Sequence, residues 1–188
     1  MKMSLYELEN RINEYIKENE LDNAEKQECD NYILYHRLIN VVKDILGDDS
    51  DKFNYYNYSS CSLKNAIQIK GKYDYIIIEY KRTRYIKNSM WNNYAYYGIK
   101  SVEIYFKDTY KSLEDFLEQD KIDYDNYKKK KENDYENMLE KIGLCYKYNI
   151  FTLNELLNFK NDFSRLDYAR QQEIKEIVKE LENKNGER

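Results

Sequence analysis

The sequence predicts an α+β protein with a small mixed or antiparallel sheet of three to four strands over residues 53–107 and helices at both ends of the chain. The densest β-branched and aromatic run, Tyr-Asp-Tyr-Ile-Ile-Ile-Glu-Tyr-Lys-Arg, lies at 73–82, near the middle, and such residues favour strands. Apolar residues outside the 53–107 region recur at helical spacing. Strands grouped centrally between helices indicate an α+β arrangement.

The length of 188 residues, 41% of them hydrophobic, fits one domain that spans the chain. Within it we expect a helical hairpin over 1–47, the sheet core over 53–107 and C-terminal helices over 112–185.

The N-terminal hairpin follows from two capping signals. Ser4 and Glu7 form a Ser-x-x-Glu capping box, so the first helix should begin at Leu5. A second helix is predicted from Asp22 to about Leu46, where Gly47 is placed to end it.

The strands are predicted from alternation and turn residues. An edge strand is expected at 53–58, a second strand at 66–70 and a third at 73–82, with a tight turn at Gly71 and Lys72 between the last two. Because both faces of 73–82 are apolar in the middle, we expect it to be covered on both sides.

Residues 84–97 fit either structure. Their apolar positions match a helical face and Gly98 could end it, so we favour a helix, although the β-rich composition leaves a strand open. Clean alternation predicts a strand at 101–107. Helices should follow over 112–119 and 124–146, then from Thr152 and from Ser164.

Composition bounds the class of protein. No run approaches the roughly 20 apolar residues that cross a bilayer, and the N-terminal residues lack the apolar core of a signal peptide, so we expect a cytoplasmic protein with no membrane partner. The three cysteines, Cys29, Cys61 and Cys145, are widely spaced and predict neither a disulfide framework nor a metal site.

The net charge of −4 is unevenly distributed. Residues 1–63 carry seven Lys and Arg against thirteen Asp and Glu, 64–107 carry nine against three, and 108–188 carry fifteen against nineteen. A basic middle between acidic ends is the most informative feature of the overall composition.

Glu79 and Lys81 are the sharpest enzymatic candidates because they share one face of the predicted central strand. The Glu-x-Lys strand, with its flanking helix and hairpin, resembles the second half of the PD-(D/E)xK nuclease motif over roughly 32–106. This resemblance implies an Mg²⁺-dependent nuclease or a degenerate relative. The family also places an aspartate on the preceding strand, which here has none; Asp51 and Asp74 are the nearest acids.

A basic and aromatic surface over 64–107 is the main binding candidate. Cations neutralise phosphates and flat rings stack on bases, while the same residue types form hot spots between proteins. The alternative is that the rings are core and the lysines solvated. The residues we expect to contact a protein or nucleic acid are Lys70, Lys72, Lys81, Arg82, Arg84, Tyr85, Lys87 and Trp91.

The N-terminal hairpin is rich in acids, which either keep it soluble or imitate a phosphate backbone.

We therefore expect a non-enzymatic protein, without cofactor, that binds a protein or nucleoprotein complex. An inhibitor of a nucleic-acid-targeting complex from a phage or mobile element, of the anti-CRISPR kind, is its specific form. The alternatives are the nuclease with Mg²⁺ and a nucleic-acid-binding protein using 64–107. The sequence specifies neither the partner's identity nor the oligomeric state.

Overall fold

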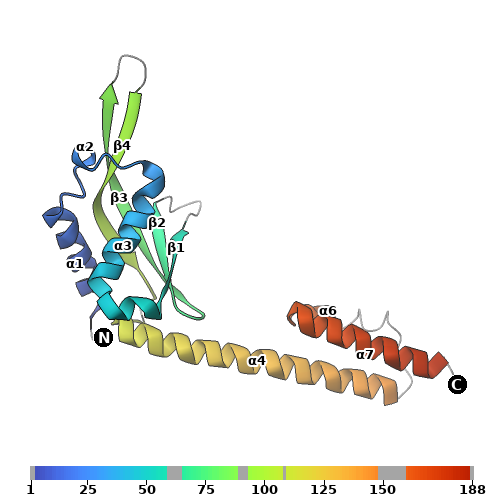
Figure 1. The fold of residues 1–188 in the computed structure, drawn as a ribbon. Helices are drawn as coiled ribbons and strands as arrows, with labels where there is room; N and C mark the ends of the chain where they lie inside the picture. The colour runs from blue at the N-terminus through green and yellow to red at the C-terminus, as the bar shows by residue number, and fades with distance from the viewer. Residues whose placement is uncertain (1–2, 59–64, 89–92, 108, 148–159, 187–188) are drawn as a thin grey trace. The chain divides into compact units, whose positions relative to one another are not determined.

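The computed structural model confirms the α+β class (Figure 1). It describes residues 3–58, 65–88, 93–107, 109–147 and 160–186.

The chain forms two compact units, residues 1–123 and 124–188. None of the helices within the described ranges is both long and apolar enough to cross a membrane. In chain order the elements are α1 (Leu5–Glu18), α2 (Ala24–Gln27), the 3-10 turn η1 (Asn31–Ile33), α3 (Leu34–Leu46), the 3-10 turn η2 (Gly47–Lys52), β1 (Asn54–Tyr58), β2 (Ala66–Lys70), β3 (Tyr75–Asn88), β4 (Asn93–Tyr105), α4 (Leu113–Lys147), α6 (Lys160–Phe163) and α7 (Tyr168–Gly186).

The first unit is built on a four-stranded antiparallel sheet in the order β1-β2-β3-β4. Helices α1 and α3 pack against the sheet and against each other, as Figure 1 shows. The side chains on the covered face are buried, as burial of one face of an antiparallel sheet requires. They include Ile67, Ile69, Ile76, Ile78, Tyr80, Val102 and Ile104.

The opposite face of the sheet, which we call the open face, corrects one prediction. Tyr75 is 41% exposed and Lys81 is also exposed, so β3 is not covered on both sides. Ile77 looked like a second core position, but it is half-buried. Its strand neighbours Gln68 and Tyr105 lie directly opposite on the same face, where cross-strand side chains shield one another.

Residues 84–88 and 93–97 are strand, and the helix favoured from the sequence is wrong for them. Cross-strand partners such as Tyr85 with Tyr96 and Lys87 with Tyr94 continue the ladder of β3 and β4. Aromatic pairs of this kind stabilise a hairpin. The helical spacing of the apolar residues was coincidental, because tertiary pairing outweighs a weak local pattern.

The predicted second helix, 22–46, is also wrong over its first half. Only α3 is regular; before it, the chain forms the single turn of α2 and passes through Glu28, whose φ of 42° is left-handed. This break lets the segment run along β4, where the amides of Tyr97 and Ile99 donate to the carbonyls of Cys29 and Leu21 at 2.8 and 2.7 Å. Long-range backbone pairing replaces helical bonds here.

The turn between β2 and β3 is held by Asp120 from α4. Its buried carboxylate accepts hydrogen bonds from the amides of Lys72, Tyr73 and Asp74 at 2.6, 2.8 and 2.5 Å. Gly71 leaves room for it, because a Cβ atom there would come within 2.4 Å of the carboxylate. The turn therefore needs both glycine and aspartate.

The capping predictions for Ser4, Ser112 and Gly47 are confirmed. Ser4 accepts from the Glu7 amide at 2.9 Å, Ser112 accepts from the Asp115 amide at 3.1 Å, and Gly47 ends α3 with a φ of 56°. These bonds satisfy helix-end groups that would otherwise lack partners.

The C-terminal helices differ from prediction. The two helices expected over 112–119 and 124–146 are one continuous α4. In the second unit, Asp167 rather than Ser164 caps α7, accepting from the Arg170 amide at 3.0 Å. A small core, formed by Met138, Ile142, Leu166, Ile174 and Val178, joins α4 to α7. The helix expected from Thr152 falls outside the described residues.

Candidate functional site

The upper parts of β3 and β4 form a two-stranded projection, which we call the ribbon (residues 82–88 and 93–99). Pairing of β3 with β2 stops at Glu79 and Ala66, so beyond Tyr80 the strand pairs only with β4. Figure 1 shows these strands extending past β1 and β2. A ribbon of two strands is marginally stable by itself, so its base requires support from elsewhere in the chain.

The predicted binding residues divide among three places. Lys70 and Lys81 lie on the open face, and Lys72 lies in the turn capped by Asp120. The ribbon carries Arg82, Arg84, Tyr85 and Lys87, whereas Trp91 falls outside the described residues.

Apolar side chains on the ribbon are exposed. Ile86 is 47% and Tyr94 51% exposed. Because Ile86 pairs with Ala95 and Tyr94 with Lys87, the two side chains lie on opposite faces of the ribbon. Arg84 is exposed on the same face as Ile86, and within the described ranges it forms no ion pair. Exposed aromatic, aliphatic and guanidinium groups on one projection, here distributed over its two faces, are typical of interfaces between proteins.

Acidic residues near α2 engage the other polar groups of the ribbon. The Lys87 ammonium pairs with Glu28 at 2.8 Å, and this hydrogen bond raises the pKa of Lys87. A hydrogen bond to Glu25 likewise raises the pKa of the Tyr85 phenol. These contacts tie the ribbon to the N-terminal segment and neutralise part of its charge.

Arg82 also faces the N-terminal segment. Its guanidinium donates to the Asn31 side chain and lies over the Tyr97 ring, 5.2 Å from the centroid, an arrangement that favours a cation electrostatically. The Thr83 hydroxyl donates to the Asp22 carbonyl. A residue larger than glycine at 98 would come within 2.5 Å of the Leu21 carbonyl, so the segment packs closely.

Glu25 and Glu28 contact the candidate binding residues Tyr85 and Lys87, and the sequence alone did not identify them. The signal was present in the opposite charges of 1–63 and 64–107, which attract each other. The sequence assigns these charges to surfaces for an external partner, whereas in the structure acidic Glu28 meets basic Lys87 within the chain.

The open face brings Glu79, Lys81 and Glu103 together. The two glutamates are direct cross-strand partners, an unfavourable placement for like charges. The Tyr105 hydroxyl lies 3.1 Å from Glu79 and 2.9 Å from Glu103, and Lys81 donates to Glu103 at 3.2 Å.

These contacts shift the pKa values of Glu103 and Tyr105. Hydrogen bonds from Tyr105 and Lys81 lower the pKa of Glu103. Hydrogen bonding to Glu103 and then Glu79 raises the pKa of Tyr105 to about 12, because a phenolate would face two carboxylates. The cluster is therefore two carboxylates bridged by a neutral phenol.

The aspartates considered for a nuclease site lie elsewhere. Burial would raise the pKa of Asp74, but hydrogen bonds from Lys107 and Tyr110 outweigh it and lower the pKa. Asp51 lies in η2. Within the described ranges, no group of three or more His, Cys, Asp or Glu residues is placed to hold a metal ion.

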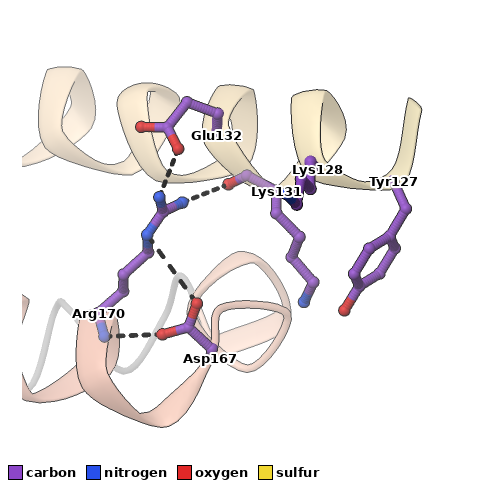
Figure 2. Close-up of a pocket in the computed structure, with 6 residues that line it drawn as sticks. All are labelled: Tyr127, Lys128, Lys131, Glu132, Asp167 and Arg170. Atoms are coloured by element: carbon purple, nitrogen blue, oxygen red, sulfur yellow. Dashed lines mark hydrogen bonds and ion pairs between the residues drawn. The ribbon is translucent and has the colours of Figure 1, made fainter. Parts of the chain in front are cut away.

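A pocket of about 300 Å³ in the second unit has a structural role (Figure 2). Arg170 pairs with Glu132, donates to the Lys131 carbonyl at 3.1 Å and contacts Asp167, its helix cap. These bonds hold α7 against α4. Lys128 in the same wall lies 4.6 Å over the Tyr124 ring.

Comparison of the chain with protein-family models, with characterised proteins and with solved structures finds no match.

Proposed function

We propose that this is a non-enzymatic binding protein that engages another protein through the ribbon. The observation that carries the proposal is that some ribbon side chains contact the N-terminal segment while others are exposed. Lys87, Tyr85 and Arg82 are held by the N-terminal segment, whereas Ile86 and Tyr94 are about half exposed. Exposed apolar groups on a supported projection suit an interface that buries them.

A protein partner is favoured over bare nucleic acid by the charge of the ribbon. Nucleic-acid affinity comes mainly from cations that neutralise phosphates. Here Glu28 already occupies Lys87, and a phosphate approaching it would meet the carboxylate. The acidic surface is similarly engaged within the chain: Glu7 pairs with Arg11 and Glu9 accepts from the Ile104 amide.

The test compares two variants of the full chain. In the ribbon variant, Ile86→Asp with Tyr94→Asp, two exposed apolar groups become charged while the buried core is unchanged. The control, Tyr6→Asp with Tyr32→Asp, removes two exposed tyrosines outside the ribbon. Each is used as bait in cells that express the natural chain, with mass spectrometry of the proteins retained. We expect a partner that binds the wild type and the control and is reduced at least tenfold by the ribbon variant.

Two results would contradict the proposal. One is a partner retained equally by both variants. The other is tight binding of short single- or double-stranded oligonucleotides by the wild type, with a steep dependence on salt that Arg84→Ala reduces; that outcome would assign the ribbon to nucleic acid.

The specific form that we propose is inhibition of a nucleic-acid-targeting complex, of the anti-CRISPR kind. Two observations support this form. The sequence is small, has segregated charge and contains no clear catalytic motif, and the ribbon exposes apolar side chains next to cationic ones. Adding the purified chain to guide-RNA-directed cleavage reactions should slow cleavage, and the ribbon variant should not. Full cleavage in the presence of excess wild-type chain would remove this form while leaving protein binding in place.

Metal-dependent cleavage of nucleic acid is the second candidate function. The observation in its favour is Glu103, which places a second carboxylate opposite Glu79, since Mg²⁺ is held by one or two carboxylates plus substrate phosphates. The test is cleavage of DNA and RNA with Mg²⁺ by the wild type, by Glu79→Ala and by the control Glu14→Ala. Loss in the first variant alone would favour a nuclease and overturn the binding proposal as the principal function.

A further inference from the structure

The outer edge of β1 is a feature of the sheet that the proposed function does not use. The strand Asn54–Tyr58 ends the sheet order, and its sequence, Asn-Tyr-Tyr-Asn-Tyr, contains neither charge nor proline. Within the described ranges, no backbone hydrogen bond is recorded from its outer side. Charge and proline are the usual means by which an edge strand discourages pairing.

The backbone ladder shows which groups face outward. The Tyr80 amide donates to the Asn65 carbonyl at 2.8 Å and the Gly71 amide to the Asp74 carbonyl at 3.0 Å. Because backbone groups in an antiparallel strand point alternately to either side, the even-numbered residues of β2 face β1.

The register then places the outward groups of β1. Asn54, Tyr56 and Tyr58 are the partners of the even-numbered residues of β2, so their N–H and C=O groups point inward. Those of Tyr55 and Asn57 point to the open edge.

The strand is self-complementary about Tyr56. If a second copy lies antiparallel with Tyr56 opposite Tyr56, then Tyr55 of each copy faces Asn57 of the other. Each such pair exchanges two N–H···O bonds, so all four outward groups of each strand are satisfied. Tyr56 then occupies a non-hydrogen-bonded position, where side chains approach most closely, and its ring is 50% exposed.

We propose that two copies of this chain associate through β1, pairing the strands antiparallel about Tyr56. The two sheets become one continuous sheet of eight strands. A second copy fits better than a foreign strand because this register satisfies every outward group with the chain's own sequence and brings no like charges together. The ribbon, at the other side of the sheet, is not used.

Proline at position 57 tests the pairing directly. Asn57→Pro removes one outward N–H from each strand, and that N–H makes no bond to β2. Asn57→Ala is the matched control because it keeps the N–H and loses only an exposed side chain. Sedimentation of the full chain over a hundredfold concentration range should show a wild-type and Asn57→Ala dimer and an Asn57→Pro monomer with an unchanged circular dichroism spectrum.

A covalent test covers the case in which the proline variant does not fold. A non-hydrogen-bonded pair places Cα atoms about 4.5 Å apart, within the roughly 4.4–6.8 Å that a disulfide bridges. Tyr56→Cys should therefore form a disulfide-linked dimer on mild oxidation. The wild type, which retains Cys29, Cys61 and Cys145, and Tyr75→Cys on the open face should not do so at a comparable rate.

Three results would overturn the proposal: a wild-type chain that stays monomeric at the highest concentration, an Asn57→Pro chain that still dimerises, or equal cross-linking of Tyr56→Cys and Tyr75→Cys. If the wild type is monomeric but loses a foreign partner on Asn57→Pro, the edge takes a strand from another protein instead. The ribbon variant Ile86→Asp with Tyr94→Asp should remain dimeric, so failure of one proposal does not decide the other.

Discussion

The two edges of the sheet differ in how far their outward backbone groups are hydrogen-bonded. Along β4, the N-terminal region closes the edge almost continuously: Cys29 and Leu21 accept from Tyr97 and Ile99, and Asn13 both donates to and accepts from Val102 at 3.2 and 2.9 Å. Along β1, no such contact is recorded in the described part of the chain. Sheet proteins ordinarily protect both edges, so the difference directs attention to β1.

The closed edge requires specific residues. Glu28 adopts a left-handed conformation, which costs a non-glycine residue free energy, and Gly98 must lack a Cβ atom. Glu9 contributes an acceptor for the Ile104 amide at 2.8 Å. Because several residues are constrained in this way, the fold depends on the closed edge. The loss in free energy of unfolding when the edge is opened measures this dependence.

The largest effect should come from proline at neighbouring positions of β1. Tyr56→Pro removes an N–H that bonds to β2 and should lower the free energy of unfolding by on the order of 3 kcal/mol. In the monomer, Asn57→Pro removes an N–H that faces outward and should change it by less than about 1 kcal/mol. Urea denaturation at a concentration that favours the monomer measures both. Equal losses would show that the outward groups of β1 are assigned wrongly.

A smaller effect should follow from opening the other edge. Gly98→Ala places a methyl group against the Leu21 carbonyl and should cost about 1–3 kcal/mol as the segment shifts. Hydrogen exchange should also accelerate at the amides of Tyr97 and Ile99. The matched control is Gly143→Ala in α4, where nothing lies within 4 Å of the new atom and a gain of roughly 0.5–1 kcal/mol is expected. Unchanged exchange in Gly98→Ala would mean that the edge does not depend on this glycine.

The smallest effect concerns a single side chain. Asn13→Ala leaves the N–H and C=O of Val102 without their partner, at a cost of about 1–2 kcal/mol that water reduces, because the site is only half-buried. Asn10→Ala, on an exposed position of the same helix, should be nearly neutral. Thermal unfolding of the two variants makes the comparison, and equal melting temperatures would show that Asn13 does not protect the edge.

The sequence predicted those parts of the fold that depend on near neighbours. Ser4, Gly47 and Ser112 act within a few residues, and the buried Ile76 and Ile78 mark a core strand by composition alone. The errors at 22–33 and at 84–88 and 93–97 share one cause. Each segment takes its conformation from the other, through contacts such as Lys87 with Glu28, 59 residues apart, and a local pattern contains no information on a partner so distant.

The candidate site could be predicted only in part, again because some of its contacts join residues far apart in the sequence. Position along the chain identified Arg82, Arg84 and Lys87 as a cluster, and they do share the ribbon. It could not show that Glu28 neutralises Lys87, or that Glu103 would stand opposite Glu79, because both depend on strand register.

The hydrogen bonds from the β2–β3 turn to Asp120 also affect how the protein folds during synthesis. Asp120 lies 46 to 48 residues after the amides that it binds, beyond all four strands. During synthesis from the N-terminus, every strand leaves the ribosome before this carboxylate does. We therefore expect the nascent sheet to remain loosely closed, and accessible to chaperones, until the start of α4 has emerged.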